Sequence, residues 1–305
     1  MKDLISIADL KTDGAERLLT LAAKVKKNPA RYQSAFKGEK FGLIFEKPST
    51  RTWVSFDVGI YSMGGSALYL GPDDIKLGVR EEVRDVARVL ERYLAGIVLR
   101  TFAHDTITEF QKYFGRPVIN GLSDFEHPCQ ALADYLTLRE KLGWKANPLM
   151  TYVGDGNNVL HSLLLLTAIL GGKLHYATPR KHEPSRVVLA QAGKIAAKTG
   201  AKLKGFHTPG AAVSGADVIY TDVWVSMGEE HLLAKKLKAF RGMQVNRRLL
   251  AHAKKNALVM HCLPAHRGEE ITEDVIEGRH SVVFDQAENR LHIQKAILLM
   301  LCKKV

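Results

Sequence analysis

Residues 45–57 of this 305-residue chain read FEKPSTRTWVSFD, with hydroxyl and guanidinium side chains next to one another after an apolar run. A helix N-terminus presents unpaired N–H groups and a partial positive charge, and both attract an anion. Arginine can also donate two parallel hydrogen bonds to neighbouring oxygens. The segment therefore indicates a phosphate pocket, with a helix cap and one solvated charge as the alternative interpretation. The side chains concerned are Ser49, Thr50, Arg51 and Thr52.

Two more polar groups follow in the N-terminal half. Arg100 ends the apolar run GIVLR, and HPCQ, residues 127–130, opens a helical pattern. His127 and Gln130 are three positions apart, so both can face one side of the helix start and donate hydrogen bonds to a carbonyl group. A strand-end charge and a hydrogen-bonded structural histidine are the alternative interpretations.

The C-terminal half has a second set of motifs. GDGNN, residues 154–158, resembles a dinucleotide-binding turn, but Val159 stands where the third glycine belongs, so the sequence gives little support for NAD binding. Asp222 opens DVWVSMGEE, and Cys262 lies in HCLP, each directly after an apolar run. A turn-forming aspartate and an inert buried cysteine are the alternatives.

These motifs need a scaffold that brings the ends of strands together. Short apolar runs alternate with helical patterns such as 81–94 and 186–199, which predicts an α/β fold with two doubly wound domains, central parallel sheets and an interdomain cleft. Ligands of such sheets bind beyond the carboxyl ends of the strands, where all the motifs fall. The predicted strands are 41–45, 67–70, 96–99 and 117–119, then 149–153, 173–177, 217–221, 257–261 and 281–284. The cluster GWKANP, at 143–148, indicates domains of residues 1–145 and 146–287.

Composition narrows the class of protein. Lysine and arginine total 44 against 32 acidic residues, and the net charge of +12 favours anionic partners. The basic residues are spread out with few aromatics among them, so we expect small anionic substrates and no nucleic acid. Three scattered cysteines indicate neither a disulfide framework nor a zinc cluster, and they favour a reducing compartment. No apolar run approaches the ~20 residues of a membrane span, and no secretion signal is evident, so we expect a cytoplasmic protein.

PSTRT, HPCQ, DGNN, DVWVSMG and HCLP, in this order, resemble the transcarbamoylases, and DVWVSMG with HCLPAHRGEE and FDQAENR is similar to the ornithine carbamoyltransferase branch. The resemblance spans essentially the whole chain. It implies transfer of the carbamoyl group of carbamoyl phosphate to the side-chain amine of L-ornithine, which yields L-citrulline and phosphate. That reaction belongs to arginine metabolism, in amino-acid biosynthesis or in the reverse direction. The resemblance implies no metal and no organic cofactor, and a homotrimer or a multiple of trimers.

The resemblance also implies roles for individual residues. The first domain would bind carbamoyl phosphate, with the C-terminal helix 288–305 packed back on it, and the second would bind ornithine. Carbamoyl phosphate would contact Ser49, Thr50, Arg51, Thr52, Arg100, His127, Gln130, Leu263 and Arg290. Ornithine would contact Asn158, Asp222, Ser226 and Met227. The catalytic groups would be Arg51, Arg100, His127, Asp222 and Cys262, with Asp222 and the Cys262 thiolate orienting the attacking amine.

Two positions depart from the family pattern. Trp53 stands where the family motif STRTR has its last arginine, and we expect this ring to pack in the domain core. Lys76 stands where ornithine enzymes commonly carry Gln or His, and it either contacts carbamoyl phosphate of a neighbouring subunit or is a solvated lysine. A transcarbamoylase for putrescine or an N-acylornithine, and a non-catalytic amino-acid or anion-binding protein, are the alternative functions. The SMG at 226–228 argues against the other amines.

Overall fold

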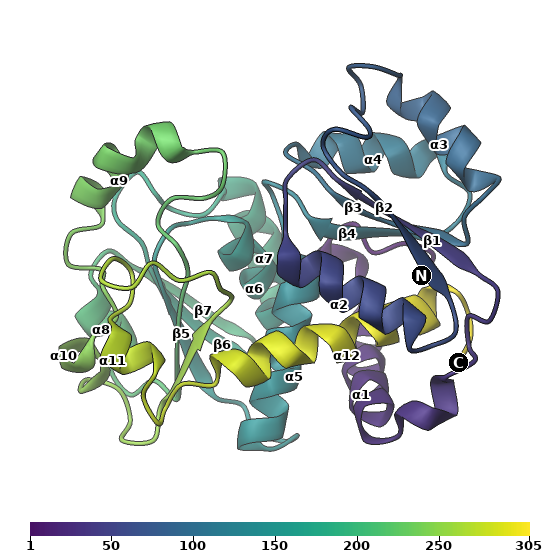
Figure 1. Ribbon diagram of the computed structural model, residues 1–305. Helices are drawn as coiled ribbons and strands as arrows, with labels where there is room; N and C mark the ends of the chain where they lie inside the picture. Colours follow the sequence, from purple (N-terminus) through teal and green to yellow (C-terminus); the bar gives the residue numbers. More distant parts are fainter. The chain divides into compact units, whose positions relative to one another are not determined.

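The computed structural model describes all 305 residues, which divide into two compact units. Unit 1 comprises Met1–Leu136 and Glu288–Val305, and unit 2 comprises Thr137–Ala287. The two divisions fall inside the long helices α5 (Pro128–Leu142) and α12 (Val283–Leu301), which are labelled in Figure 1. None of the helices combines the length and the apolar character that crossing a lipid bilayer requires.

Unit 1 is built on a four-stranded parallel sheet in the order β2-β1-β3-β4. Figure 1 shows α3 and α4 on one side of these strands and α2 on the other. The strands are β1 (Lys40–Phe45), β2 (Ser66–Leu70), β3 (Gly96–Arg100) and β4 (Val118–Leu122). The helices that complete the unit with α5 and α12 are α1 (Thr12–Lys27), α2 (Thr50–Tyr61), α3 (Val83–Glu91) and α4 (His104–Tyr113), with 3-10 turns at Ile7–Asp9 and Pro29–Tyr32.

The inner strands of unit 1 are apolar because helices cover both of their faces. All of β3 is buried, and β1 is buried after its first residue, whereas the edge strand β2 is only partly covered. α3 and α4 meet the sheet in a core formed mainly by Ile44, Val83, Val86, Ala87, Ile97, Leu99, Ile107, Phe110, Phe114 and Val118. This core fixes the sheet whose carboxyl edge carries the predicted phosphate motif.

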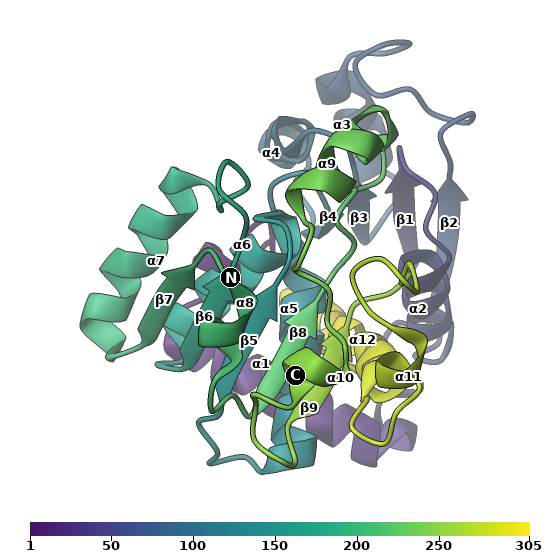
Figure 2. The ribbon, with the colours of Figure 1, turned by 90° about the vertical axis from the view of Figure 1, so that its left-hand side faces the viewer.

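Unit 2 has a five-stranded parallel sheet in the order β7-β6-β5-β8-β9, seen nearly in full in Figure 2. The strands are β5 (Leu149–Val153), β6 (Lys173–Ala177), β7 (Lys202–Phe206), β8 (Val218–Thr221) and β9 (Leu258–His261). The helices are α6 (Asn158–Ile169), α7 (Arg186–Thr199), α8 (Pro209–Val213), α9 (Leu233–Ala239), α10 (Arg247–Leu250) and α11 (Glu273–Ile276), with a 3-10 turn at Glu230–Leu232. The predicted α/β class with parallel sheets is confirmed.

One observed strand was missed, and one predicted strand does not form. Strand β7, KLKGF, was missed because its alternating lysines and its glycine suit a half-exposed edge strand and leave no apolar run. The predicted strand 281–284 does not form, since only Ser281 makes an isolated bridge, to Val259, and α12 begins at Val283. The apolar pair Val282 and Val283 is buried at a helix start, a case that periodicity over four residues does not distinguish from a strand.

Candidate functional site

The first three motifs meet at the carboxyl edge of the unit 1 sheet. β3 lies between β1 and β4, so the segments that follow these strands are neighbours. The backbone N–H of Glu46 donates to the carbonyl of Arg100 at 2.8 Å, and that of Thr101 donates to the carbonyl of Leu122 at 3.0 Å. PSTRT, Arg100 and HPCQ therefore lie on adjacent connections, as the sequence predicts for a parallel sheet.

Ser49 caps α2 while its neighbours stay available at the helix start. Its hydroxyl accepts the backbone N–H of Thr52 at 3.3 Å, which is the alternative interpretation of this segment. Thr50 is exposed and Arg51 is half-buried at the first turn of α2. The first turn of this 12-residue helix thus combines a cap with a guanidinium and a hydroxyl near its positive end.

Arg290 of α12 joins the two motifs of unit 1. Its side chain is 3% exposed, and it donates at 2.8 Å to Thr52 Oγ1 of the STRT segment and at 2.8 Å to Gln130 Oε1 of HPCQ. Its Nη1 also lies 3.3 Å from His127 Nε2. The amide nitrogen of Gln130 in turn donates to Asp134 Oδ1 at 2.8 Å, so a buried network orients these groups.

His127 is buried and neutral. Burial lowers the pKa of His127 well below 6.5, and the positive charges of Arg290, Arg100 and Arg51 lower it further. Because Arg290 donates to Nε2, that nitrogen is the acceptor and the ring proton sits on Nδ1. A neutral imidazole with its proton on Nδ1 is a hydrogen-bond donor to a carbonyl oxygen and not a charged partner of phosphate.

In unit 1, Trp53 lies differently from the expectation, and Lys47 is a buried cation that the sequence analysis missed. Trp53 is 42% exposed and contacts Tyr69 with ring centroids 4.7 Å apart and the ring planes tilted by 32°, so the expectation of core packing was wrong. Its position, one residue after the buried Thr52, faces outward on α2. Lys47 was missed: it is 7% exposed, directly before Pro48, with its ammonium 4.5 Å from the centroid of the Phe102 ring. Lys76 is exposed in the connection from β2 to α3.

The GDGNN turn of unit 2 is shaped by close packing of backbones. A Cβ at Gly156 would come within 2.4 Å of the Glu183 carbonyl carbon and the Pro184 nitrogen, so only glycine fits. Asn157 caps α6 by accepting the N–H groups of Val159 and Leu160, and its Nδ2 donates to Asp222 Oδ2 at 2.7 Å. Asn157 therefore orients Asp222, and Asn158, which the sequence predicts to contact ornithine, is the first residue of α6.

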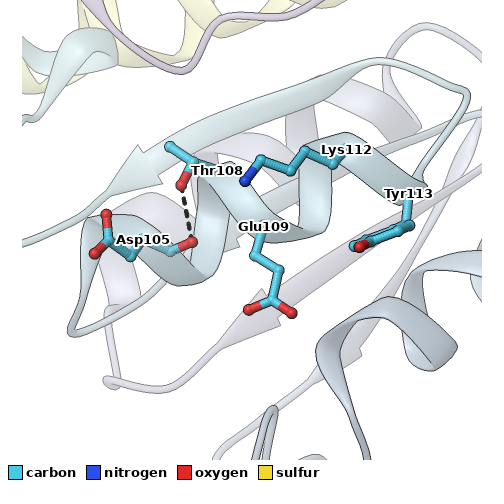
Figure 3. A pocket seen from close by; sticks show the side chains of 5 residues that line it. All are labelled: Asp105, Thr108, Glu109, Lys112 and Tyr113. Carbon is cyan, nitrogen blue, oxygen red and sulfur yellow. Dashed lines mark hydrogen bonds between the residues drawn. The ribbon is translucent and has the colours of Figure 1, made fainter.

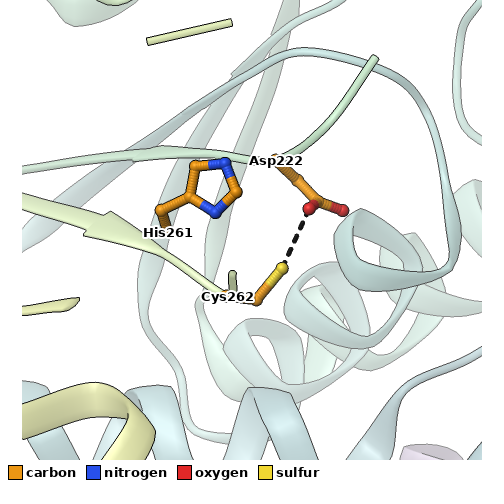
Figure 4. A group of neighbouring side chains, drawn as sticks. All are labelled: Asp222, His261 and Cys262. Carbon is orange, nitrogen blue, oxygen red and sulfur yellow. Dashed lines mark hydrogen bonds between the residues drawn. The ribbon is translucent and has the colours of Figure 1, made fainter. Parts of the chain in front are cut away.

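Asp222 and Cys262 are direct partners, as Figure 4 shows. They follow the neighbouring strands β8 and β9, and the Cys262 thiol donates to Asp222 Oδ1 at 2.9 Å. With the bond from Asn157, both carboxylate oxygens of Asp222 accept a hydrogen bond, and Asp222 is 5% exposed. The pair presents a carboxylate and a sulfur side by side, the groups that would orient an amine.

The His261 ring is hydrogen-bonded to the backbone of the HCLP turn. Its Nδ1 accepts the backbone N–H of Leu263 at 2.9 Å, so its Nε2 carries the proton and donates to Glu270 Oε1 at 3.0 Å. His261 and Glu270 are fully buried, and the N–H of His266 also donates to Glu270. The ligand atoms of Asp222, His261 and Cys262 lie within 4.8 Å of one another, but both nitrogens of His261 are engaged and offer no lone pair to an ion.

The remaining predicted residues of unit 2 lie on two loops. Leu263 follows Cys262 with φ 56°, a left-handed conformation that is uncommon for a residue other than glycine. Ser226 is half-buried and Met227 is 45% exposed in the loop after β8. The structure thus brings Asp222 and Cys262 into contact and places Leu263 beside them, while the other predicted carbamoyl-phosphate residues lie in unit 1.

A hollow of about 460 Å³ is lined by residues of α4 alone, and none of them belongs to these motifs (Figure 3). Carboxylates and an amine line it, and the hydroxyl of Thr108 bonds to the Asp105 carbonyl within the same helix. Groups of both charges on one exposed helix surface do not form a convergent site. Its lining residues are Asp105, Thr108, Glu109, Lys112 and Tyr113.

Comparisons with known proteins agree with the geometry. Residues 2–140 match the family described as "Aspartate/ornithine carbamoyltransferase, carbamoyl-P binding domain", and residues 147–301 match "Aspartate/ornithine carbamoyltransferase, Asp/Orn binding domain". The chain is 50% identical over 308 residues to an ornithine carbamoyltransferase of Archaeoglobus fulgidus, covering 100% of this chain and 98% of that one. It is 51% identical over 298 residues to one of Methanothermobacter thermautotrophicus, covering 98% of each.

A solved structure described as the ornithine carbamoyltransferase from Pyrococcus furiosus superimposes with a TM-score of 0.96 at 46% identity, and the match covers 100% of this chain and 98% of that one. An anabolic ornithine carbamoyltransferase from Campylobacter jejuni also gives 0.96, at 36% identity and with full coverage of both chains. Sequence identity, fold and the order of the motifs agree, and the chain belongs to the aspartate/ornithine carbamoyltransferase family.

Proposed function

We infer that this chain is an ornithine carbamoyltransferase, which transfers the carbamoyl group of carbamoyl phosphate to the side-chain amine of L-ornithine. The products are L-citrulline and phosphate. The observation that carries this function is about 50% identity to ornithine carbamoyltransferases over nearly the whole chain, together with matches to both domains of the family. A panel of ornithine, putrescine and N-acetylornithine with carbamoyl phosphate tests it, and formation of citrulline from ornithine should dominate.

We assign carbamoyl phosphate to residues 1–145 with helix 288–305. The support is the carboxyl edge of the unit 1 sheet, where the STRT helix start, Arg100 and the HPCQ segment are adjacent. Arg51 and Arg100 bind the phosphate oxygens, and the Nδ1 proton of neutral His127 is donated to the carbonyl oxygen as negative charge develops there. Arg290 keeps Thr52, His127 and Gln130 in place through its three contacts.

We assign L-ornithine to residues 146–287. Asp222 and Cys262 orient the side-chain amine, and Ser226 and Met227 contact the rest of the amino acid. The contact of the Cys262 thiol with the Asp222 carboxylate supports this role, because an acceptor-rich pair suits an amine that must lose a proton before attack. The neutral amine then attacks the carbonyl carbon, the C–O bond to phosphate breaks, and phosphate leaves with the bonding electrons and takes up the proton that the nitrogen loses as the C–N bond forms.

Arg51→Ala tests the phosphate assignment. We expect a loss of about 10²–10³-fold in turnover, the range for removal of one donor that stabilises developing charge, with the fold intact. The matched control is Arg17→Ala, which removes an exposed guanidinium on α1 of the same unit. Turnover of Arg51→Ala close to that of the control would refute the phosphate pocket.

We further propose a homotrimer or a multiple of trimers. The support in the chain is an apolar surface in unit 1 formed by Trp53, Val54, Val58 and Tyr61 of α2 and Leu68 of the edge strand β2, each 42–78% exposed. Exposed apolar patches beside an edge strand are typical of interfaces, and we assign this one to a second copy of the chain. Sedimentation should give a trimer or a multiple of it, and Val58→Glu should dissociate it. A monomeric wild-type chain would refute the assembly.

We also propose a biosynthetic direction and a cytoplasmic location. The name of a relative from Pyrococcus furiosus, 47% identical, is "Ornithine carbamoyltransferase, anabolic". All three cysteines are free thiols, as a reducing compartment favours. Complementation of an ornithine carbamoyltransferase deletion on medium without arginine tests the direction, and cell fractionation tests the location.

A further inference from the structure

Lys236 of α9 is a buried lysine between two carboxylates. Its side chain is 6% exposed, and its Nζ lies 2.7 Å from Asp155 Oδ2 and 2.6 Å from Glu229 Oε2. Its neighbour Lys235 on the same helix is exposed to solvent. The proposed mechanism does not use Lys236, although burying an ammonium is costly unless its partners are well placed.

The two carboxylates keep this lysine charged. Burial lowers the pKa of Lys236, but the Asp155 and Glu229 carboxylates outweigh that effect and raise the pKa above 10.5. Burial also raises the pKa of Asp155, and Lys236 opposes that rise by charge and by hydrogen bonding. The His182 ring lies on the other side, with Nδ1 3.5 Å from Asp155 Oδ1 and its ring against Phe240.

The carboxylates belong to two segments of the proposed ornithine site. Asp155 lies in the GDGNN turn, two residues before the Asn157 that donates to Asp222. Glu229 lies in the loop after β8, and its Oε2 also accepts the backbone N–H of Ser226 at 3.3 Å. One ammonium therefore links the turn that orients Asp222 to the loop that carries Ser226 and Met227.

The start of the loop is anchored in the unit 2 core by Trp224, which is 6% exposed and stacks on Phe240 with ring centroids 5.6 Å apart, so Lys236 is a second anchor, at Glu229, for this loop. Its backbone bonds are local, with the N–H of Glu229 donating to the carbonyl of Ser226 and that of Gly228 donating to the Glu230 side chain. Met227 is 45% exposed. Lys236 links Glu229 of this loop to Asp155, which is 81 positions from Lys236 in the chain. Both hydrogen bonds run from the ammonium to a carboxylate.

We propose that Lys236 is a positioning residue for ornithine, which acts through Glu229 to hold the 223–230 loop in the conformation that binds the amino acid. The inference rests on the proposed assignment of Ser226 and Met227 to ornithine. Small displacements of such a loop change substrate positioning strongly, since misplacement by about 1 Å can cost about 10²-fold. Binding of carbamoyl phosphate, which is assigned to other residues, does not depend on this link.

The test is steady-state kinetics of Lys236→Met, Lys236→Arg and Glu229→Gln, with Lys235→Met as the matched control. We expect KM for ornithine to rise about tenfold or more in Lys236→Met and Glu229→Gln, with KM for carbamoyl phosphate changed less than about twofold. Lys236→Arg keeps the charge and should recover part of the ornithine affinity. A purely structural defect would lower the active fraction, and so kcat, without changing KM for one substrate alone.

Glu229→Gln keeps the experiment decisive if Lys236→Met does not fold, because it leaves the buried pair of Lys236 and Asp155 intact. A KM for ornithine within about twofold of the Lys235→Met value in Glu229→Gln would overturn the proposal. Asp222→Ala, measured in parallel, distinguishes an error in the role of Lys236 from an error in the ornithine site. If Asp222→Ala raises KM for ornithine and Glu229→Gln does not, only the role of Lys236 is wrong; if neither does, the ornithine site itself is wrong.

Discussion

Replacement of Arg290 by methionine should separate the stability of unit 1 from its activity. The guanidinium is 3% exposed and makes two 2.8 Å bonds, to Thr52 Oγ1 and Gln130 Oε1, with a weaker contact to His127. Methionine has a similar length and no charge, so it removes the donors and keeps most of the buried volume.

The free energy of unfolding should fall only modestly. Two hydrogen bonds from a charged group are worth ~3–6 kcal/mol together. Removing the cation also removes its desolvation penalty, which is several kcal/mol for a buried ion. The two terms largely offset, and we expect a net destabilisation of about 1–3 kcal/mol by urea unfolding.

Turnover should fall much further. Without Arg290 the side chains of Thr52, His127 and Gln130 lose their common partner, and loss of one preorganised donor at developing charge costs ~2.7–4 kcal/mol, or about 10²–10³-fold in kcat. The pKa of His127 should also rise, because Arg290 is one of the charges that lower it, but it should stay below 6.5 because burial is the largest cause. NMR titration of the His127 ring measures that change.

The assay is citrulline formation at saturating ornithine with carbamoyl phosphate varied, with exposed Arg17→Met on α1 as control. A kcat/KM for carbamoyl phosphate within about threefold of the control, in a protein destabilised by more than about 4 kcal/mol, would show that Arg290 is only structural and would refute the reasoning.

Three further predictions follow from the structure. Cys262→Ser should weaken ornithine binding and change the pH profile of kcat/KM, and an unchanged profile would remove the thiol from proton transfer. Because burial lowers the pKa of His127 below 6.5, its contribution to stability is complete above that pH and declines as the pH falls below it, so His127→Gln should reduce the loss of Tm on acidification. Glu270→Leu should lower the free energy of unfolding by about 2–4 kcal/mol, since the donors of His261 and His266 lose their acceptor, and urea unfolding with a loss under about 1 kcal/mol would contradict the buried pair.

Strand and motif positions were readable from the sequence because they depend on local chemistry. Buried parallel strands are continuous apolar runs, so eight of the nine observed strands were anticipated, and the polar residues after them had to lie at one edge of each sheet. β7 is the exception, because its lysines give no apolar run. The order of five motifs was enough to indicate the family, which is confirmed.

The partners of individual side chains were decided by the tertiary structure. Arg290 and Thr52 are 238 residues apart, and Lys236 and Asp155 are 81 apart, so no local pattern relates them. The same holds for Asn157: the sequence indicated a polar turn, but only the parallel pairing of β5 with β8 brings Asn157 to Asp222. The positions of strands and motifs along the chain follow from short-range propensity. Which side chains form hydrogen bonds or ion pairs with one another depends on how distant segments pack, and the core sets that packing.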